Sequence, residues 1–152
     1  CLVGSEMCIR DRLRICASFG GVFGFSVMFN SPKELSATAG IIGAIANTLR
    51  LELVDLASLP PAAAAFIGAL TAGILASVLK SKIGYPRISL TVPSIVIMVP
   101  GLYLYRAIYN LGVMSLQTSA SWFAAAILII LALPLGLIFA RILTDKTFRY
   151  CT

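Results

Sequence analysis

The chain has 152 residues, of which 59% are apolar and 12% are charged, and its formal net charge is +6. Soluble domains carry about 45–50% apolar and about 25% charged residues, so this composition excludes an ordinary water-soluble domain and favours a protein surrounded by lipid. The basic residues lie between apolar runs and form no basic stripe with interleaved aromatic residues, which excludes a nucleic-acid-binding protein.

The first twelve residues, Cys1–Arg12, read as a translated technical sequence. Back-translated, C-L-V-G-S-E-M-C-I-R-D-R fits a transposase adapter used in DNA library preparation, read in frame. We therefore expect a non-native segment over residues 1–12 and one transmembrane domain over residues 13–152; the alternative is a genuine, short polar N-terminus. Cys16 and Cys151 then remain, far apart and without metal-ligand spacing, and are expected to pack as small apolar residues or to stay free.

Five apolar segments approach the length of about 20 residues that a membrane-crossing helix needs. In chain order they cover residues 15–29, 35–49, 59–79, 88–105 and 122–143. The third, with Pro60 and Pro61 at its start, and the fifth, with Trp122 as an interface anchor, are the clearest. Each of the others has a re-entrant or interfacial helix as its alternative, so four crossings compete with five. The sequence thus predicts an all-α, polytopic membrane protein with about five transmembrane helices.

Lysine and arginine placement predicts the orientation of these helices. With five crossings, one side of the membrane carries Lys33, Lys80, Lys82, Arg87, Arg141, Lys146 and Arg149, whereas the other carries Arg14, Arg50 and Arg106. The positive-inside rule then places the C-terminus in the cytoplasm and the N-terminal end outside.

Small residues recur at four-residue spacing within the apolar segments. The pairs are Gly20 with Gly24, Ala39 with Gly43, Ala64 with Gly68, Gly68 with Ala72, and Ala69 with Gly73. Such spacing lets helix backbones approach closely in lipid. It favours tight bundling or an oligomer over a ligand site.

The fourth segment contains two prolines that should break its helix. Pro93 and Pro100 lie seven residues apart, and Gly101 follows the second. Proline removes a backbone donor and clashes with the preceding turn, and the freed polar groups must face protein or a water-filled cavity rather than lipid. Broken helices near the midplane bind polar substrates in transporters, so we expect Pro93, Ser94, Pro100 and Gly101 to form a substrate-binding element. The alternative, a merely kinked structural helix, is equally supported.

Two polar residues are expected to assist this element. Arg106 follows the break and could hold a substrate carboxylate, although an interfacial arginine beside aromatic-belt tyrosines fits at least as well. Asn47 shares a helix face with Arg50, and both precede Glu52 and Asp55. The favoured interpretation of these charges is that they end their helix at the water interface; a proton relay is the alternative.

The sequence contains no histidine. This excludes histidine-based acid–base chemistry, catalytic triads that need an imidazole, and most zinc sites. No carboxylate pair lies within an apolar segment either. We therefore expect neither an enzyme nor a bound metal or cofactor.

With these motifs in view, the chain resembles the threonine/serine exporter family, in the form of its C-terminal half or of the smaller subunit of its split members. The resemblance covers most of residues 14–143. Its motifs are G-F-S-V-M-F-N-S-P over residues 24–32 with Leu35, the small-residue run 39–46, and Val92-Pro93 to Val99-Pro100-Gly101 followed by Tyr105-Arg106-Ala107. The Pro-x6-Pro-Gly element with Tyr-Arg is the more specific part.

The resemblance implies a ten-span exporter built from two five-span halves, with this chain as one of them. It further implies export of threonine and serine, driven by the proton motive force, across a bacterial cytoplasmic membrane. A larger partner subunit of the same family, a homo-oligomer, or both are the implied partners. The alternatives are a subunit that exports small dicarboxylates such as succinate, and a structural or assembly subunit without a substrate site.

Overall fold

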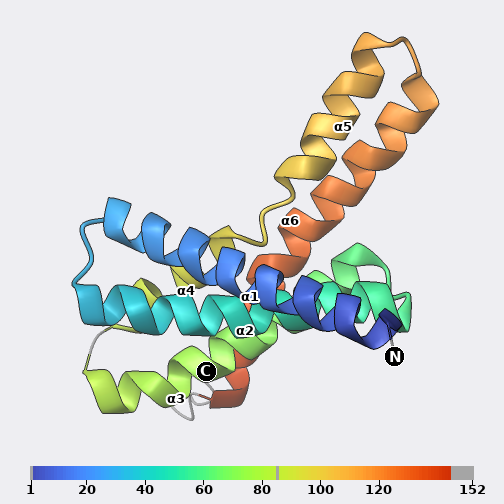
Figure 1. The fold of residues 1–152 in the computed structure, drawn as a ribbon. Helices are drawn as coiled ribbons and strands as arrows, with labels where there is room; N and C mark the ends of the chain where they lie inside the picture. Colours follow the sequence, from blue (N-terminus) through green and yellow to red (C-terminus); the bar gives the residue numbers. More distant parts are fainter. Residues whose placement is uncertain (1, 85, 145–152) are drawn as a thin grey trace, which may run out of the picture.

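The computed structural model describes residues 2–84 and 86–144, and these residues form helices joined by short turns (Figure 1). The helices are α1 (Leu2–Met28), α2 (Lys33–Ala57), α3 (Pro61–Ile83), α4 (Arg87–Val96), α5 (Gly101–Gly112) and α6 (Leu116–Thr144). The predicted all-α membrane fold is confirmed. The fourth predicted segment corresponds to two helices, α4 and α5, which are separated by the predicted break.

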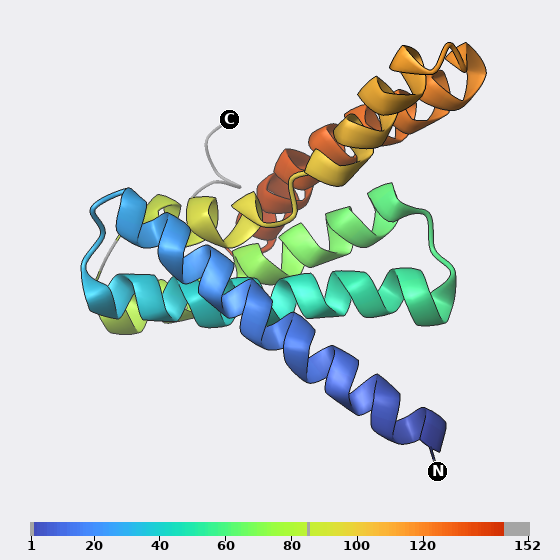
Figure 2. The ribbon, with the colours of Figure 1, turned by 45° about the horizontal axis from the view of Figure 1, so that its top comes forward.

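Four stretches of the described chain are long and apolar enough to cross a membrane. They are Lys33–Ala57, Pro61–Lys80, Arg87–Gly112 and Leu116–Thr144, the third of which contains the break. Helix α1 is not among them, because its apolar part begins only after Arg14. It nevertheless packs against α2, lying obliquely across it (Figure 2).

Two helix boundaries differ from the sequence prediction. Helix α2 ends at Ala57 rather than near Leu49, and Ser58 closes it in a left-handed conformation with φ 50°. Helix α6 begins at Leu116, before Trp122, so residues 116–121 extend the last predicted apolar segment as helix. Apolar packing favours continuing both helices, even though polar residues interrupt the apolar pattern at these ends. Helix α3 begins at Pro61 as predicted.

Close approach at small residues holds the helices together. A Cβ at Gly73 would lie 2.5 Å from the Cβ of Ala140, and one at Gly136 would lie 2.6 Å from the carbonyl oxygen of Phe66, so α3 and α6 touch almost backbone to backbone. The four-residue spacing therefore predicted packing correctly at Gly73. For Gly20 and Gly24 it did not, since added Cβ atoms there would meet nothing within 4 Å.

Helix α5 packs on the first half of α6, and together they project from the rest of the bundle as an arm (Figure 1). Within the arm, the hydroxyl of Ser119 donates to the carbonyl of Ala107 at 2.6 Å, and the rings of Tyr103 and Trp122 lie 5.6 Å apart. The outer face of the arm is apolar and exposed, with Ile108 at 69% and Phe123 at 52% exposure. Such a surface suits lipid or another membrane helix.

Candidate functional site

The break between α4 and α5 is formed by tight turns over residues 97–100. The amide of Met98 donates to the carbonyl of Ile95 at 2.9 Å, and that of Val99 donates to Val96 at 3.1 Å. Pro100 follows with φ −80° and ψ 52°, and α5 starts at Gly101. Pro100 has no amide hydrogen, which together with Gly101 directly after it favours ending the helix here, and the carbonyls before it need other donors.

Arg50 of α2 supplies one of these donors. Its Nη1 atom donates to the carbonyl oxygen of Met98 at 3.2 Å, and the residue is only 9% exposed. Of the charges expected to end this helix, Arg50 does not do so, because α2 continues to Ala57, just past Asp55. Helix α2 continues past Arg50, and the side chain turns inward because the broken helix offers a carbonyl without a helical partner. The sequence pattern did place Arg50 on one helix face with Asn47, and this shared face was the sequence signal that the two residues belong to one polar site.

Ser94 connects the helix before the break to α2. Its side chain is fully buried; the hydroxyl lies 2.6 Å from the carbonyl oxygen of Leu90 and 3.1 Å from that of Ala39. Gly43 allows this approach, since a Cβ there would lie 3.2 Å from the carbonyl oxygen of Ser94. Pro93 is buried beside Ser94 but does not end α4, which runs to Val96. The break therefore belongs to Pro100 and Gly101, whereas Pro93 is buried inside α4 and Ser94 contacts the backbone of α2.

A second polar contact of α2 is made by Asn47, which lies one turn before Arg50. The amide nitrogen of Asn47 donates to the hydroxyl oxygen of Ser18 on α1 at 2.8 Å, and both residues are buried. We call Ser18, Asn47, Thr48, Arg50 and the carbonyl of Met98 the junction cluster. It brings α1 and α2 together with the broken helix, and Gly68 of α3 packs against Arg50 and Met98.

The junction cluster retains unused hydrogen-bonding capacity. Among the described residues, the buried Oδ1 of Asn47, Oγ1 of Thr48 and Nε of Arg50 have no hydrogen-bond partner. Buried polar groups of this kind cost free energy unless something satisfies them, about 1–3 kcal/mol each. Thr48 also lines a cavity of about 320 Å³ between α1 and α2, together with Ile15, Ile45, Leu49 and Glu52. Of the junction cluster, only Thr48 lines this cavity; the cluster as a whole contains one cation, two hydroxyls, an amide and a backbone carbonyl.

Arg106 does not join the junction cluster. It lies on the arm, where its guanidinium carbon sits 4.9 Å above the ring of Trp122. The residue is exposed, as are the neighbouring Tyr105 and Tyr109. Of the six residues expected to bind substrate, the structure therefore gathers Asn47, Pro93 and Ser94 around α2 and places Pro100 and Gly101 at the break, while Arg106 is apart.

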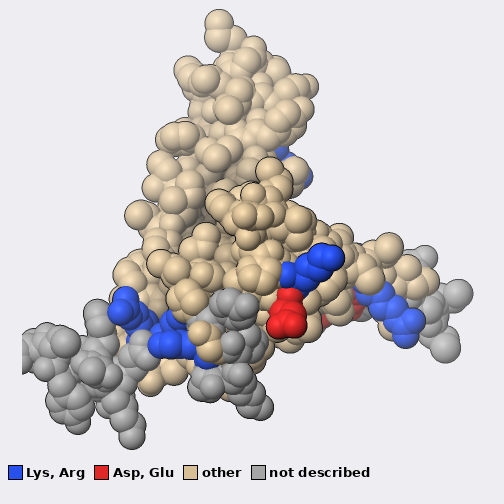
Figure 3. Space-filling view, turned by 90° about the vertical axis from the view of Figure 1, so that its left-hand side faces the viewer, with Lys and Arg blue, Asp and Glu red and all other residues tan. Residues whose placement is uncertain are grey.

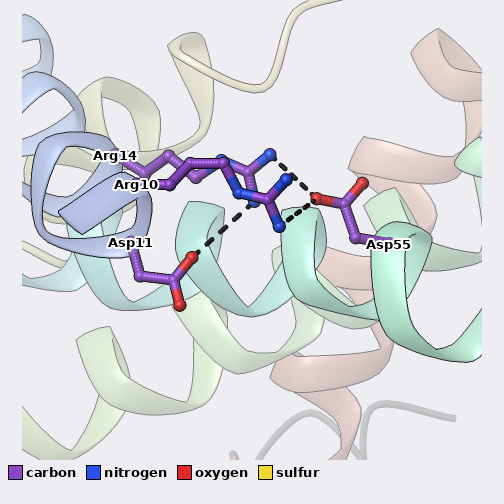
Figure 4. Close-up of polar contacts among 4 residues, drawn as sticks. All are labelled: Arg10, Asp11, Arg14 and Asp55. Carbon is purple, nitrogen blue, oxygen red and sulfur yellow. Dashed lines mark ion pairs between the residues drawn. The ribbon is translucent and has the colours of Figure 1, made fainter. Parts of the chain in front are cut away.

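An ion pair links the first two helices near the end of α2. The Nη2 atom of Arg14 lies 2.8 Å from Oδ2 of Asp55, while Arg10 and Asp11 make longer contacts of 3.6 and 3.9 Å in the same group (Figure 4). Arg10 and Asp11 fall in the segment expected to be non-native, whereas Arg14 and Asp55 both lie in the expected transmembrane domain. Their pair fixes where α1 lies against α2, and with it the position of Ser18.

The comparison with known families decides the class of this protein. A family model described as Threonine/Serine exporter, ThrE, matches residues 14–143. The chain belongs to the threonine/serine exporter family. The match covers α2 to α5 in full, and with them the helix break and the junction cluster. No curated protein and no solved structure matches the chain. The protein is thus a multi-pass membrane component of an exporter, in a family of transporters.

Proposed function

We propose that this exporter component carries threonine or serine outward, and that the junction cluster binds the amino acid. The observation that carries the proposal is the contact between Arg50 and the Met98 carbonyl, a buried cation held at a broken helix. Burying an ionisable residue inside a membrane segment costs free energy. Such residues therefore pair with backbone or substrate groups and mark transport pathways. Broken helices at this depth expose backbone groups only where protein or substrate satisfies them.

The chemistry of the cluster matches a hydroxy amino acid group by group. A carboxylate suits the guanidinium of Arg50, which can form paired hydrogen bonds with it. An ammonium suits Oδ1 of Asn47 and the carbonyl of Met98, and a side-chain hydroxyl suits Thr48. A dicarboxylate such as succinate matches less well, because the cluster offers one cation alongside carbonyl acceptors that would repel a second carboxylate.

Binding at this cluster would couple to the helix break. A substrate carboxylate competes with the Met98 carbonyl for Arg50, so occupancy releases the break from α2 and frees that carbonyl for the ammonium. A ligand shifts a conformational equilibrium by as much as its affinities for the two states differ. Alternating access would then consist of the half-helices α4 and α5 moving relative to α2.

We also propose the setting in which this transport occurs. The domain over residues 13–152 would act with a larger subunit of the same family, a second copy of itself, or both, and the exposed apolar arm supplies surface for such packing. The membrane would be the bacterial cytoplasmic membrane. Figure 3 shows Lys and Arg in separate groups across the lower part of the molecule, with Asp and Glu among them. Support for a cytoplasmic C-terminus comes from Lys80, Arg87 and Arg141, which lie around one cavity near the ends of α3 and α6.

The test variant is Arg50→Gln, and Arg50→Lys keeps the positive charge at the same position. The control is Arg106→Gln, which also removes one cation but lies outside the junction cluster. Each variant is expressed together with a larger-subunit member of the threonine/serine exporter family in bacteria that accumulate threonine, and threonine efflux is measured per amount of protein in the membrane. Hydrogen bonds to charged groups contribute about 1.5–3 kcal/mol, so Arg50→Gln should lower efflux about 10- to 150-fold. Arg50→Lys should be intermediate, and Arg106→Gln should stay within about twofold of the parent.

The opposite pattern would overturn the proposal. Unchanged efflux in Arg50→Gln would remove the junction cluster from the transport path, and a large loss in Arg106→Gln would move the site to the arm. Competition by excess succinate, but not by serine, would reassign the cargo to dicarboxylates. Efflux that depends on the chain's presence but on none of these residues would make it an assembly subunit.

A further inference from the structure

A second cavity, separate from the junction cluster, opens where α3 ends, α4 begins and α6 nears its end. Its volume is about 340 Å³, and it is lined by Lys80, Pro86, Arg87, Ile88, Thr91, Leu137 and Arg141. The export mechanism proposed above uses none of these residues.

The charge of this basic cavity is strongly positive. Lys80, Arg87 and Arg141 come from three different helices, and none of the described residues that line the cavity is acidic. The first turn of α4 adds to the field, because helix α4 begins at Arg87 beside the cavity and its unpaired amides carry partial positive charge. Arg87 is also fixed in place, since its Nη2 atom donates to the carbonyl of Gly73 at 3.1 Å.

One edge of the basic cavity is apolar and faces outward. Ile88 is 69% exposed at the start of α4, and α6 presents Ile138 and Leu143 at 49% and 60% exposure. Helices α3 and α6 both belong to stretches long and apolar enough to cross a membrane, and these cations lie near the ends of the stretches, which is where lipid headgroups meet a membrane-crossing helix. A charged pocket beside exposed aliphatic side chains suits a molecule with an anionic head and an apolar tail.

We infer that the basic cavity binds the phosphate headgroup of an anionic membrane lipid. Lys80, Arg87 and Arg141 surround the phosphate, and the acyl chains lie along Ile88 and the outer face of α6. A free amino acid does not fit this site, because its ammonium would face three cations and meet no acidic residue of the described lining. The site is therefore separate from the proposed export site and holds the ends of α3, α4 and α6 together.

The test measures lipid binding to the purified full chain in uncharged detergent. Short-chain phosphatidylglycerol, phosphatidylcholine of the same chain length and inorganic phosphate are titrated by calorimetry. The variant is Lys80→Gln with Arg141→Gln, and the control is Lys33→Gln with Arg106→Gln, which lowers the net charge equally away from the cavity. Arg87 is left intact because it also binds the backbone of α3.

Each basic side chain near an anionic lipid contributes about fivefold in affinity. The cavity variant should therefore bind phosphatidylglycerol about 25-fold more weakly than the parent, and the control should change less than twofold. The single variant Lys80→Gln, which disturbs the fold least, should lose about fivefold. Equal losses in cavity variant and control, or equal binding of phosphatidylcholine, would overturn the inference. Inorganic phosphate that binds as tightly as the lipid and displaces it would assign the cavity to a free anion instead.

Discussion

Replacing Gly136 by alanine should destabilise the protein, because no space exists for a methyl group where α6 crosses α3. The new Cβ would lie 2.6 Å from the carbonyl oxygen of Phe66, 2.9 Å from the Cβ of Ala69 and 3.1 Å from the amide nitrogen of Leu70. These neighbours belong to the helix backbone or to a short side chain, so the two helices must separate. Overpacking of this kind costs about 1–3 kcal/mol.

The matched control is Gly24→Ala in α1, where nothing lies within 4 Å of the added Cβ. Both substitutions exchange glycine for alanine inside a helix and gain about 0.5–1 kcal/mol of backbone stability. The difference between them therefore isolates the steric cost. Reversible unfolding by a denaturing detergent in mixed micelles gives both free energies of unfolding. If Gly136→Ala is as stable as Gly24→Ala, the backbone contact between α3 and α6 is absent from the protein in its membrane.

Other substitutions test other parts of the structure. Ser94→Ala should lower the free energy of unfolding by about 1 kcal/mol in the same assay, because a buried hydroxyl bond is lost; no change would show that Ser94 does not tie α4 to α2. Replacing Pro100 and Gly101 together by leucine should restore a continuous helix and abolish threonine efflux while membrane insertion, measured by fractionation, is kept; surviving efflux would refute the broken-helix mechanism. Asp55→Asn should cost at most about 1 kcal/mol, because its pair with Arg14 is partly exposed, and a larger loss would show a more deeply buried pair.

The sequence predicted the features that depend on local covalent chemistry. Pro100 has no amide hydrogen and is followed by Gly101, so the sequence favoured a helix break there, whereas Pro93 and Pro134 lie inside α4 and α6 without ending them. The start of α3 at Pro61 follows from the same property. The membrane environment followed from composition alone, and the family followed from the Pro-x6-Pro-Gly element.

Features that depend on a distant partner were not predicted. Arg50 looked like a helix end because charged residues cluster after it; only the position of the Met98 carbonyl from another helix shows why it is buried. Arg106 follows the break closely in sequence, yet α5 leads away from the bundle and sets its guanidinium against Trp122. Glycine spacing likewise could not distinguish Gly73, which meets another helix, from Gly24, which meets none.

Helix α6 is shared between the two parts of the molecule, with its last turns against α3 and its first turns against α5. It has 29 residues, which corresponds to a rod about 43 Å long at 1.5 Å per residue. Geometry makes such a rod a lever whose pivot is the tight crossing at Gly136. From Gly136 to Leu116 the rod measures about 30 Å at 1.5 Å per residue, so tilting it by about 10° about this pivot moves the tip by about 5 Å, and a small rearrangement beside α3 is amplified into a large swing on the opposite side of the fold.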